Sequence, residues 1–333
     1  MIIRLKKDLT ENKANELGKE FQAFVLKQNG VYVLVTPNKL KELDAKHKSF
    51  VDETFVFNDD IQLASKKYIT STREIKISDK ISIGGKTNNS VIITGPCSVE
   101  SEEQLEQCAQ LCVKLGVKIL RAGAYKPRTS PYTFQGMGID GLKLLDKMRS
   151  KYGLKIISEV RDSTHVQEII EYADIVQIGA KSMYDHGILK ACAKSSKTVL
   201  LKRGFGTTVQ EFVQAAEFIL SGGNENVILC ERGIRTFETK TRFTLDLCGV
   251  AWLKENINLP IILDSSHAIG YAYGVADLSR ACMAMGVEGL LIETHPNPAV
   301  AKSDASQQLN FEEFTKLYQS LSIVAKAVGR NII

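Results

Sequence analysis

The sequence predicts an α/β protein in which a (β/α)8 barrel, or TIM barrel, follows a small ferredoxin-like α+β domain. The chain has 333 residues, enough for a barrel of about 250 residues and a small extra domain. From residue 91 onward, eight short apolar runs alternate with helical segments, as expected for strands buried on both faces. Chemically reactive side chains follow the ends of most of these runs, where barrel enzymes place their active sites.

The first 70 residues have the order β-α-β-β-α-β, which predicts a ferredoxin-like domain. We expect helices at 11–18 and 39–46, and strands at 2–5, 23–27, 31–35 and 53–57. Asn29-Gly30 between the two middle strands is a strong hairpin signal. No cluster of residues here predicts catalysis. A packing or oligomerisation module and a regulatory module that binds a small effector therefore both remain open.

A polar stretch at 79–90 predicts a linker, placed at 71–90, before a catalytic domain at 91–333. The eight barrel strands are expected at 91–94, 118–122, 155–159, 175–178, 198–202, 226–230, 260–263 and 289–293. Capping signals predict that helices start after Ser101, Thr208 and Asn310. A doubly wound open sheet is the structural alternative. The absence of a GxGxxG motif after the first strand disfavours a dinucleotide-binding fold.

The composition excludes several classes of protein. Hydrophobic residues make up 44% and charged residues 24%, which is typical of soluble globular domains. The net charge of +5 comes without a dense Lys/Arg run, which disfavours nucleic acid as a partner. No apolar run approaches the roughly 18 residues of a membrane span, and the N-terminus lacks the features of a signal peptide. Seven scattered cysteines favour reduced thiols and a cytoplasmic location.

Four residues at or beyond the ends of barrel strands form a possible metal set. Cys97 follows the first strand, His267 follows the seventh, Glu293 ends the eighth, and Asp304 lies further on. One thiolate, one imidazole and two carboxylates suit Mn, Fe, Co or Zn better than magnesium. A lone cysteine at a strand end is usually a core residue, but Cys97 lies past the strand. His295, two residues after Glu293, is a spare candidate.

Lysines and arginines form a second group at the same strand ends. They are Arg121, Lys126, Arg128, Lys181, Lys202 and Arg232. A single cation at a strand end is often merely solvated. Six cations at one face of a barrel need anions to neutralise them, and phosphates and carboxylates are the natural candidates.

The motifs that carry these residues resemble those of 3-deoxy-D-arabino-heptulosonate 7-phosphate (DAHP) synthase. They are GPCSVES (95–101), RAGAYKPRTSPYTFQGMG (121–138), LLKRGFG (200–206), ILCERGIRTFE (228–238), DSSH, ETHPNP and SDASQ. The resemblance covers residues 70–333 and is to the short microbial subtype, preceded by a ferredoxin-like or ACT-like domain. It implies a metal-dependent transferase of the shikimate pathway of aromatic amino acid biosynthesis. Such an enzyme condenses phosphoenolpyruvate with erythrose 4-phosphate and water and releases phosphate.

The resemblance also implies a role for each candidate residue. Cys97, His267, Glu293 and Asp304 would hold Mn²⁺, with Fe²⁺, Co²⁺ and Zn²⁺ as alternatives. Phosphoenolpyruvate would be clamped by Arg121, Lys126, Lys181, Lys202 and Arg232, and the sugar phosphate by Arg128 and Thr129. The catalytic residues would be Lys126, Cys97 and His267: the metal polarises the aldehyde, and Lys126 or a metal-bound water protonates the alkoxide. The group that activates the attacking water stays open.

Three positions depart from the family pattern. Lys181 stands in place of Arg in IGAR, Ser265 in place of Pro, and Ala305 in place of Gly. These changes leave open a divergent paralogue with another aldose phosphate acceptor. An octulosonate 8-phosphate synthase is disfavoured by KPRTS, and a non-catalytic sensor is disfavoured by the intact ligand set. The resemblance further implies a homotetramer and feedback by tyrosine or phenylalanine through residues 1–70.

Overall fold

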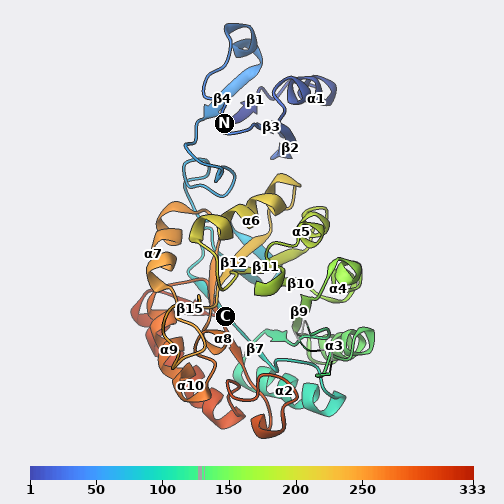
Figure 1. Cartoon of the computed structure of the whole chain (residues 1–333), viewed down its shortest axis with the longest axis vertical. Coiled ribbons are helices and arrows are strands. Elements are labelled where there is room, and N and C mark those ends of the chain that lie inside the picture. The colour runs from blue at the N-terminus through green and yellow to red at the C-terminus, as the bar shows by residue number, and fades with distance from the viewer. Residues whose placement is uncertain (127–129, 131) are drawn as a thin grey trace.

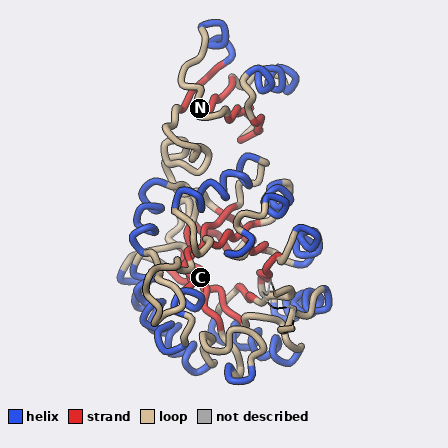
Figure 2. Tube along the Cα trace, in the orientation of Figure 1, coloured by secondary structure: helices blue, strands red, loops and turns tan. Residues whose placement is uncertain are grey.

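The structure, a computed structural model, describes residues 1–126, 130 and 132–333. In this described part, eight parallel strands form a closed ring with helices around it (Figures 1 and 2). The ring consists of β7 (Asn89–Gly95), β8 (Ile119–Arg121), β9 (Lys155–Val160), β10 (Ile175–Ile178), β11 (Thr198–Lys202), β12 (Val227–Glu231), β13 (Ile261–Asp264) and β14 (Gly289–Glu293). It closes where β14 pairs with β7, with Glu293 beside Gly95. The predicted TIM barrel is confirmed. A short strand, β15 (Asn331–Ile332), also pairs with β7.

Alternate residues of the barrel strands belong to two separate cores. On β7, Val91 and Ile93 point into the barrel, where they pack with residues such as Ile157 and Ile228. Ile92 points outward and packs in the layer between strands and helices. This alternation follows from the two-residue period of a strand. Because both faces are buried, the strands are mostly apolar.

Helices cover the outside of the barrel (Figure 2). They are α2 (Glu102–Leu115), α3 (Ile139–Tyr152), α4 (Val166–Tyr172), α5 (His186–Ala193), α6 (Val209–Ser221), α7 (Leu247–Asn256), α9 (Ala272–Ala284) and α10 (Phe311–Ala327), while the short α8 (Ser265–Ile269) follows the carboxyl end of β13. The three predicted caps are confirmed: Ser101 caps α2, and Thr208 and Asn310 form reciprocal capping boxes with Glu211 and Glu313. No helix in the described residues is long and apolar enough to cross a membrane.

The segment expected to be a linker contains a β-hairpin, β5 (Ile75–Ser78) and β6 (Ile81–Ile83). Ile75, Ile81 and Ile83 are buried and belong to the core inside the barrel. They pack with Val91 at the amino-terminal end of its strand, so the hairpin closes that end of the barrel. The sequence pattern concealed this because the isoleucines lie among polar residues and glycines.

The N-terminal part is a four-stranded antiparallel sheet in the order β2-β3-β1-β4. Its elements are β1 (Ile2–Leu5), α1 (Glu11–Glu20), β2 (Phe24–Gln28), β3 (Val31–Val35), the 3-10 helix η1 (Ala45–Phe50) and β4 (Val51–Phe55). The α-helix expected at 39–46 is wrong. Leu40 and Leu43 pack against the small core of this sheet from irregular backbone. Eight residues are too few to form a stable helix by themselves, so tertiary packing decides their conformation.

Candidate active site

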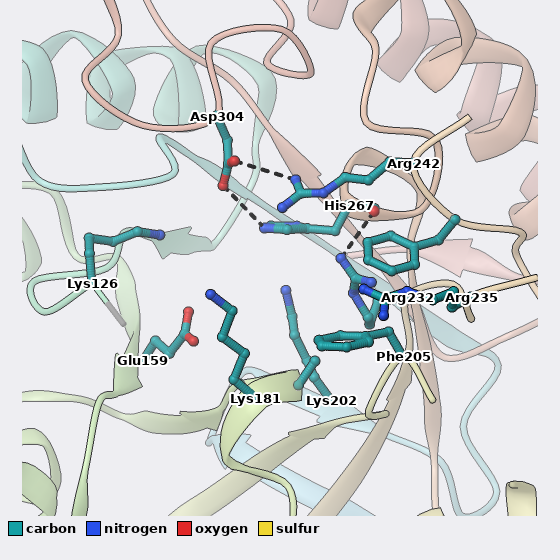
Figure 3. A pocket seen from close by; sticks show the side chains of 13 residues that line it. Lys126, Glu159, Lys181, Lys202, Phe205, Arg232, Arg235, Arg242, His267 and Asp304 are labelled. Carbon is teal, nitrogen blue, oxygen red and sulfur yellow. Dashed lines mark hydrogen bonds and ion pairs between the residues drawn. The ribbon is translucent and has the colours of Figure 1, made fainter. Parts of the chain in front are cut away.

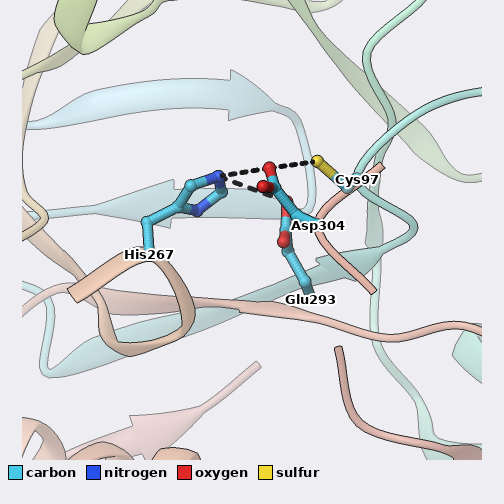
Figure 4. A group of neighbouring side chains, drawn as sticks. All are labelled: Cys97, His267, Glu293 and Asp304. Atoms are coloured by element: carbon cyan, nitrogen blue, oxygen red, sulfur yellow. Dashed lines mark hydrogen bonds and ion pairs between the residues drawn. The ribbon is translucent and has the colours of Figure 1, made fainter. Parts of the chain in front are cut away.

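Four side chains with metal-binding atoms meet at the carboxyl ends of the barrel strands (Figure 4). One ligand atom from each of Cys97, His267, Glu293 and Asp304 lies within 4.8 Å of the others. Glu293 ends β14, Cys97 follows β7, and His267 lies on α8 directly after β13. The structure therefore brings together the residues that the sequence analysis grouped as a metal set. Sulfur, nitrogen and carboxylate oxygen around one point form a donor set that fits a divalent transition metal.

Cys97 is fully buried and lies between a carboxylate and an ammonium group. Its thiol donates a hydrogen bond to Asp304 Oδ2 at 3.1 Å, and Nζ of Lys126 lies 3.0 Å from its Sγ. Burial, together with the negative charges of Glu293 and Asp304, raises the pKa of Cys97 to about 12. The thiol therefore keeps its proton until a cation replaces it.

Neighbouring side chains orient the metal set. Asp264 Oδ2 lies 2.8 Å from Nδ1 of His267, which leaves Nε2 facing Glu293 Oε1 at 3.5 Å. Gln307 Nε2 donates to Glu293 Oε2 at 2.6 Å. Asp304 has φ of +47°, a left-handed backbone conformation that is uncommon for residues other than glycine and typical of functional sites. These contacts fix the directions of the ligand atoms.

A cavity of about 490 Å³ opens beside this set (Figure 3). His267 and Asp304 belong to the metal set and also line this cavity. The other charged side chains on the described wall are Lys126, Glu159, Lys181, Lys202, Arg232, Arg235 and Arg242. Six cations thus face two carboxylates. Such an excess of positive charge in a concave site attracts anions and holds them.

Two aromatic rings support the guanidinium groups of the wall. Arg235 lies 5.0 Å over the ring of Phe205, and Arg232 lies 4.2 Å over the ring of Phe243. The two rings are themselves 5.6 Å apart. Arg235 forms no salt bridge with any residue that the structure describes, so its charge is available to a bound anion.

The match to a known family covers most of the barrel. Residues 68–328 match the DAHP synthetase I family. The chain belongs to this family. Phospho-2-dehydro-3-deoxyheptonate aldolase of Thermotoga maritima is 48% identical over 238 residues, which are 72% of this chain and 70% of that protein. The enzyme class predicted from the sequence, a 3-deoxy-7-phosphoheptulonate synthase, is thereby confirmed.

Two further comparisons agree with membership of this family. The crystal structure of the Thermotoga maritima enzyme, described as DAHP synthase, superimposes with a TM-score of 0.81 and 38% identity, covering 100% of this chain and 99% of that one. The 2-dehydro-3-deoxyphosphooctonate aldolase of Fusobacterium nucleatum is only 30% identical over 281 residues, 78% of this chain and 99% of that protein. The octulosonate alternative is therefore the weaker one.

The cationic residues predicted for this family member occupy different places. Lys126, Lys181, Lys202 and Arg232 line the cavity. Arg121 is instead buried behind the metal set, paired with Glu293 and lying 3.6 Å from Glu159 Oε2.

Arg128 and Thr129 lie outside the described residues. His295, the spare candidate, is not in the metal set; its Nδ1 accepts a hydrogen bond from the backbone of Asn297 at 3.0 Å.

The sequence analysis did not single out several residues of the site. Glu159, Arg235, Arg242 and Asp264 all contribute to it. Glu159, Arg235 and Asp264 had been noted only as members of strands or motifs. Position was the available signal for Glu159 and Asp264, because both lie near the carboxyl end of a barrel strand. Arg242, in the long loop after β12, had no such signal.

Proposed function

We propose that this enzyme condenses phosphoenolpyruvate with erythrose 4-phosphate and water to give 3-deoxy-D-arabino-heptulosonate 7-phosphate and phosphate. One observation carries the proposal: the metal set adjoins the cationic cavity, because two of its residues, His267 and Asp304, line that cavity. Such a cavity can hold a reactive aldehyde near the metal set while its cations bind two phosphorylated substrates.

We propose Mn²⁺ as the ion at Cys97, His267, Glu293 and Asp304, with Fe²⁺, Co²⁺ and Zn²⁺ as alternatives. When bound there, such an ion supplies Lewis-acid polarisation of the aldehyde oxygen. The side chains around the set prepare for it: Gln307 fixes one oxygen of Glu293, and Asp264 lies against the remote nitrogen of His267.

We propose that Lys202, Arg232 and Arg235 bind the phosphate of phosphoenolpyruvate and that Lys181 completes the clamp for its phosphate and carboxylate. Arg121, although paired with Glu293, would add to this clamp through Nε and Nη2, which have no hydrogen-bond partner in the described residues. Arg232 supports this because its only described hydrogen bonds are to the carbonyl oxygens of Gly233 and His267. A guanidinium held away from carboxylates retains its donors for a substrate anion. The same groups stabilise the phosphate as it leaves.

Lys126 is the proposed proton donor to the new alkoxide. Burial lowers its pKa, but Cys97, Glu159 and Glu293 raise it, so the net shift is upward and the ammonium keeps its proton. Its Nζ lies 3.0 Å from Cys97 Sγ and also reaches the cavity. It can therefore give a proton at the side of the cavity where the aldehyde would lie.

We propose that Glu159 orients the water that attacks carbon 2 of the donor. Its carboxylate lies between Lys126 and Lys181 on the cavity wall (Figure 3). Gln177 Nε2 donates to Glu159 Oε2 at 2.9 Å, and a side chain at Gly179 would collide with the other carboxylate oxygen. The carboxylate is thus held in one orientation, as a water-positioning group must be.

The remaining parts of the proposal concern the acceptor and the N-terminal part. Arg128 and Thr129 are proposed to bind the phosphate of erythrose 4-phosphate. We assign residues 1–70 to a ferredoxin-like, ACT-like domain and 91–333 to the catalytic barrel, joined by 71–90, whose hairpin closes the amino-terminal end of the barrel. The antiparallel order β2-β3-β1-β4 supports the first assignment. We further propose feedback by tyrosine or phenylalanine through that domain, a homotetramer and a cytoplasmic location, where Cys97 stays reduced.

A phosphate-release assay tests the reaction. Purified enzyme with phosphoenolpyruvate and Mn²⁺ is given either erythrose 4-phosphate or arabinose 5-phosphate. We expect metal-dependent release with the four-carbon sugar and at most a trace with the five-carbon sugar. Equal or greater turnover of arabinose 5-phosphate would instead support the octulosonate reaction, and turnover of neither sugar would point to another acceptor.

A further inference from the structure

A second cavity, of about 410 Å³, lies between the N-terminal sheet and helix α6, away from the metal set. Figure 1 shows β2 and β3 facing α6 at this junction. Its described lining is Gln22, Phe24, Val35, Thr36, Pro37, Asp60, Gln62, Gln214, Glu217, Phe218 and Ser221. The volume falls within the range of roughly 300–1,000 Å³ that small-molecule sites occupy.

Hydrogen bonds hold the two sides of this cavity together. Glu217 on α6 accepts from the backbone N–H of Gln62 and Ala64, both at 2.8 Å, and of Leu63 at 3.2 Å. Gln62 then reaches the other side, where its Nε2 donates to the carbonyl of Thr36 at 2.9 Å. The cavity is therefore formed before any ligand arrives, which lowers the entropic cost of binding.

The walls are aromatic and apolar. Phe24 is 60% exposed and Phe218 is 39% exposed, although both rings border the same concave surface. Val35 and Pro37 add apolar area beside them. An apolar body placed here would remove this surface from water, at about 25 cal/mol for each Å² covered.

The charged and unsatisfied groups of the cavity are all acceptors. Asp60 is exposed and forms no salt bridge with a described residue. Gln62 is only 6% exposed, and its Oε1 has no hydrogen-bond partner in the described part of the chain. No lysine or arginine belongs to the described lining, so a carboxylate or phosphate on a ligand would find no counter-charge there.

We propose that this cavity binds a small molecule with an aromatic body and a single ammonium head. The ring would lie against Phe24 and Phe218, and the ammonium would face Asp60 and Gln62. The same chemistry disfavours an amino acid zwitterion, since its carboxylate would meet only acceptors, so the amino acid proposed as feedback effector would bind at another site. The site is thus distinct from the catalytic cavity, where the excess charge is positive.

Calorimetric titration of the full-length enzyme with 2-phenylethylamine tests this, with 3-phenylpropionate as the comparison. We expect the amine to bind at least about 10-fold more tightly than the carboxylate, since a lost charge-assisted contact is worth about 1.5–3 kcal/mol. Phe24→Ser and Asp60→Asn should each lower the affinity for the amine by at least about fivefold. Ile323→Ser and Asp52→Asn, which replace exposed residues outside the cavity, should leave this affinity unchanged.

Three results would overturn the proposal: no binding of the amine at millimolar concentration, equally tight binding of 3-phenylpropionate, or undiminished binding of the amine by the Phe24→Ser and Asp60→Asn variants. Turnover of phosphoenolpyruvate and erythrose 4-phosphate should be unchanged in both variants, which shows that they fold. Because the titration contains neither substrate nor metal, its outcome does not depend on the proposed catalytic roles.

Discussion

Asp264 Oδ2 lies 2.8 Å from Nδ1 of His267, at the centre of the active site. The same oxygen lies 2.5 Å from Nζ of Lys202, on the cationic wall. Despite its burial, the carboxylate has a pKa well below the ordinary value because His267 and Lys202 stabilise its charge. One buried anion therefore orients a residue of the metal set and a residue of the phosphate clamp together.

Asp264→Asn should weaken both halves of the site. The amide keeps the shape but removes the charge that faces His267 and Lys202, and lost partners of this kind typically cost about 10- to 100-fold in metal affinity. We also expect a higher KM for phosphoenolpyruvate. Metal titration followed by steady-state kinetics measures both effects. Asp277→Asn, an exposed change on α9, is the control. Unchanged metal affinity would show that Asp264 does not orient His267.

Cys97→Ala should abolish metal-dependent turnover while the barrel stays folded. The thiol is the only sulfur in the set and is in contact with Asp304 and Lys126. Bound metal is measured by elemental analysis after dialysis, and folding by thermal melting. Cys112→Ala removes another buried thiol, from the outer core, and should keep both metal and activity. Stoichiometric metal in the Cys97 variant would remove this residue from the ligand set.

Lys181→Arg should lower the KM for phosphoenolpyruvate by roughly 3- to 10-fold. Lys181 lines the cationic cavity, and an arginine at this place adds a planar, bidentate donor for phosphate or carboxylate. Lys190→Arg, on the outside at the end of α5, controls for the general effect of the exchange. An unchanged KM would mean that this side chain does not contact the donor substrate.

The parts of the fold and site that follow from local pattern could be predicted, and those that depend on tertiary context could not. Continuous apolar runs located the strands, and Cys97, His267 and Glu293 were found because strand ends of a barrel converge. The hairpin with Ile81 was missed because burial inside the barrel leaves no periodic pattern in three residues. Glu159 was missed because the local sequence around a single acid at a strand end is the same whether its carboxylate lines a cavity or only pairs with a neighbouring cation.

Arg235→Ala should raise the KM for phosphoenolpyruvate by about 10- to 100-fold, because a charge-assisted hydrogen bond contributes about 1.5–3 kcal/mol. Its guanidinium lies over Phe205 at the cavity wall, with no described carboxylate partner. Arg235→Lys should give an intermediate KM. Arg280→Ala, a control on the exposed side of α9, should leave the KM unchanged. If the KM for the sugar phosphate rose instead, Arg235 would belong to the acceptor site.

Glu217→Gln should change how stability depends on pH. Burial raises the pKa of Glu217 to about 7, against 4.5 for an ordinary glutamate. The folded protein therefore keeps a proton that the unfolded chain loses. The stability that this proton provides is fully present below pH 4.5 and is lost as the pH rises towards 7.

Glutamine cannot titrate, so this loss should be absent from the variant. The free energy of unfolding of the native protein should therefore fall relative to that of the variant between pH 5 and pH 8. We expect a shift on the order of 2 kcal/mol, allowing for partial exposure. Thermal melting at several pH values measures it, and Glu255→Gln, in which an exposed glutamate on α7 is replaced, is the control. Parallel pH profiles for the native protein and the Glu217 variant would show that this carboxylate is ionised at neutral pH and holds the backbone of residues 62–64 as an anion.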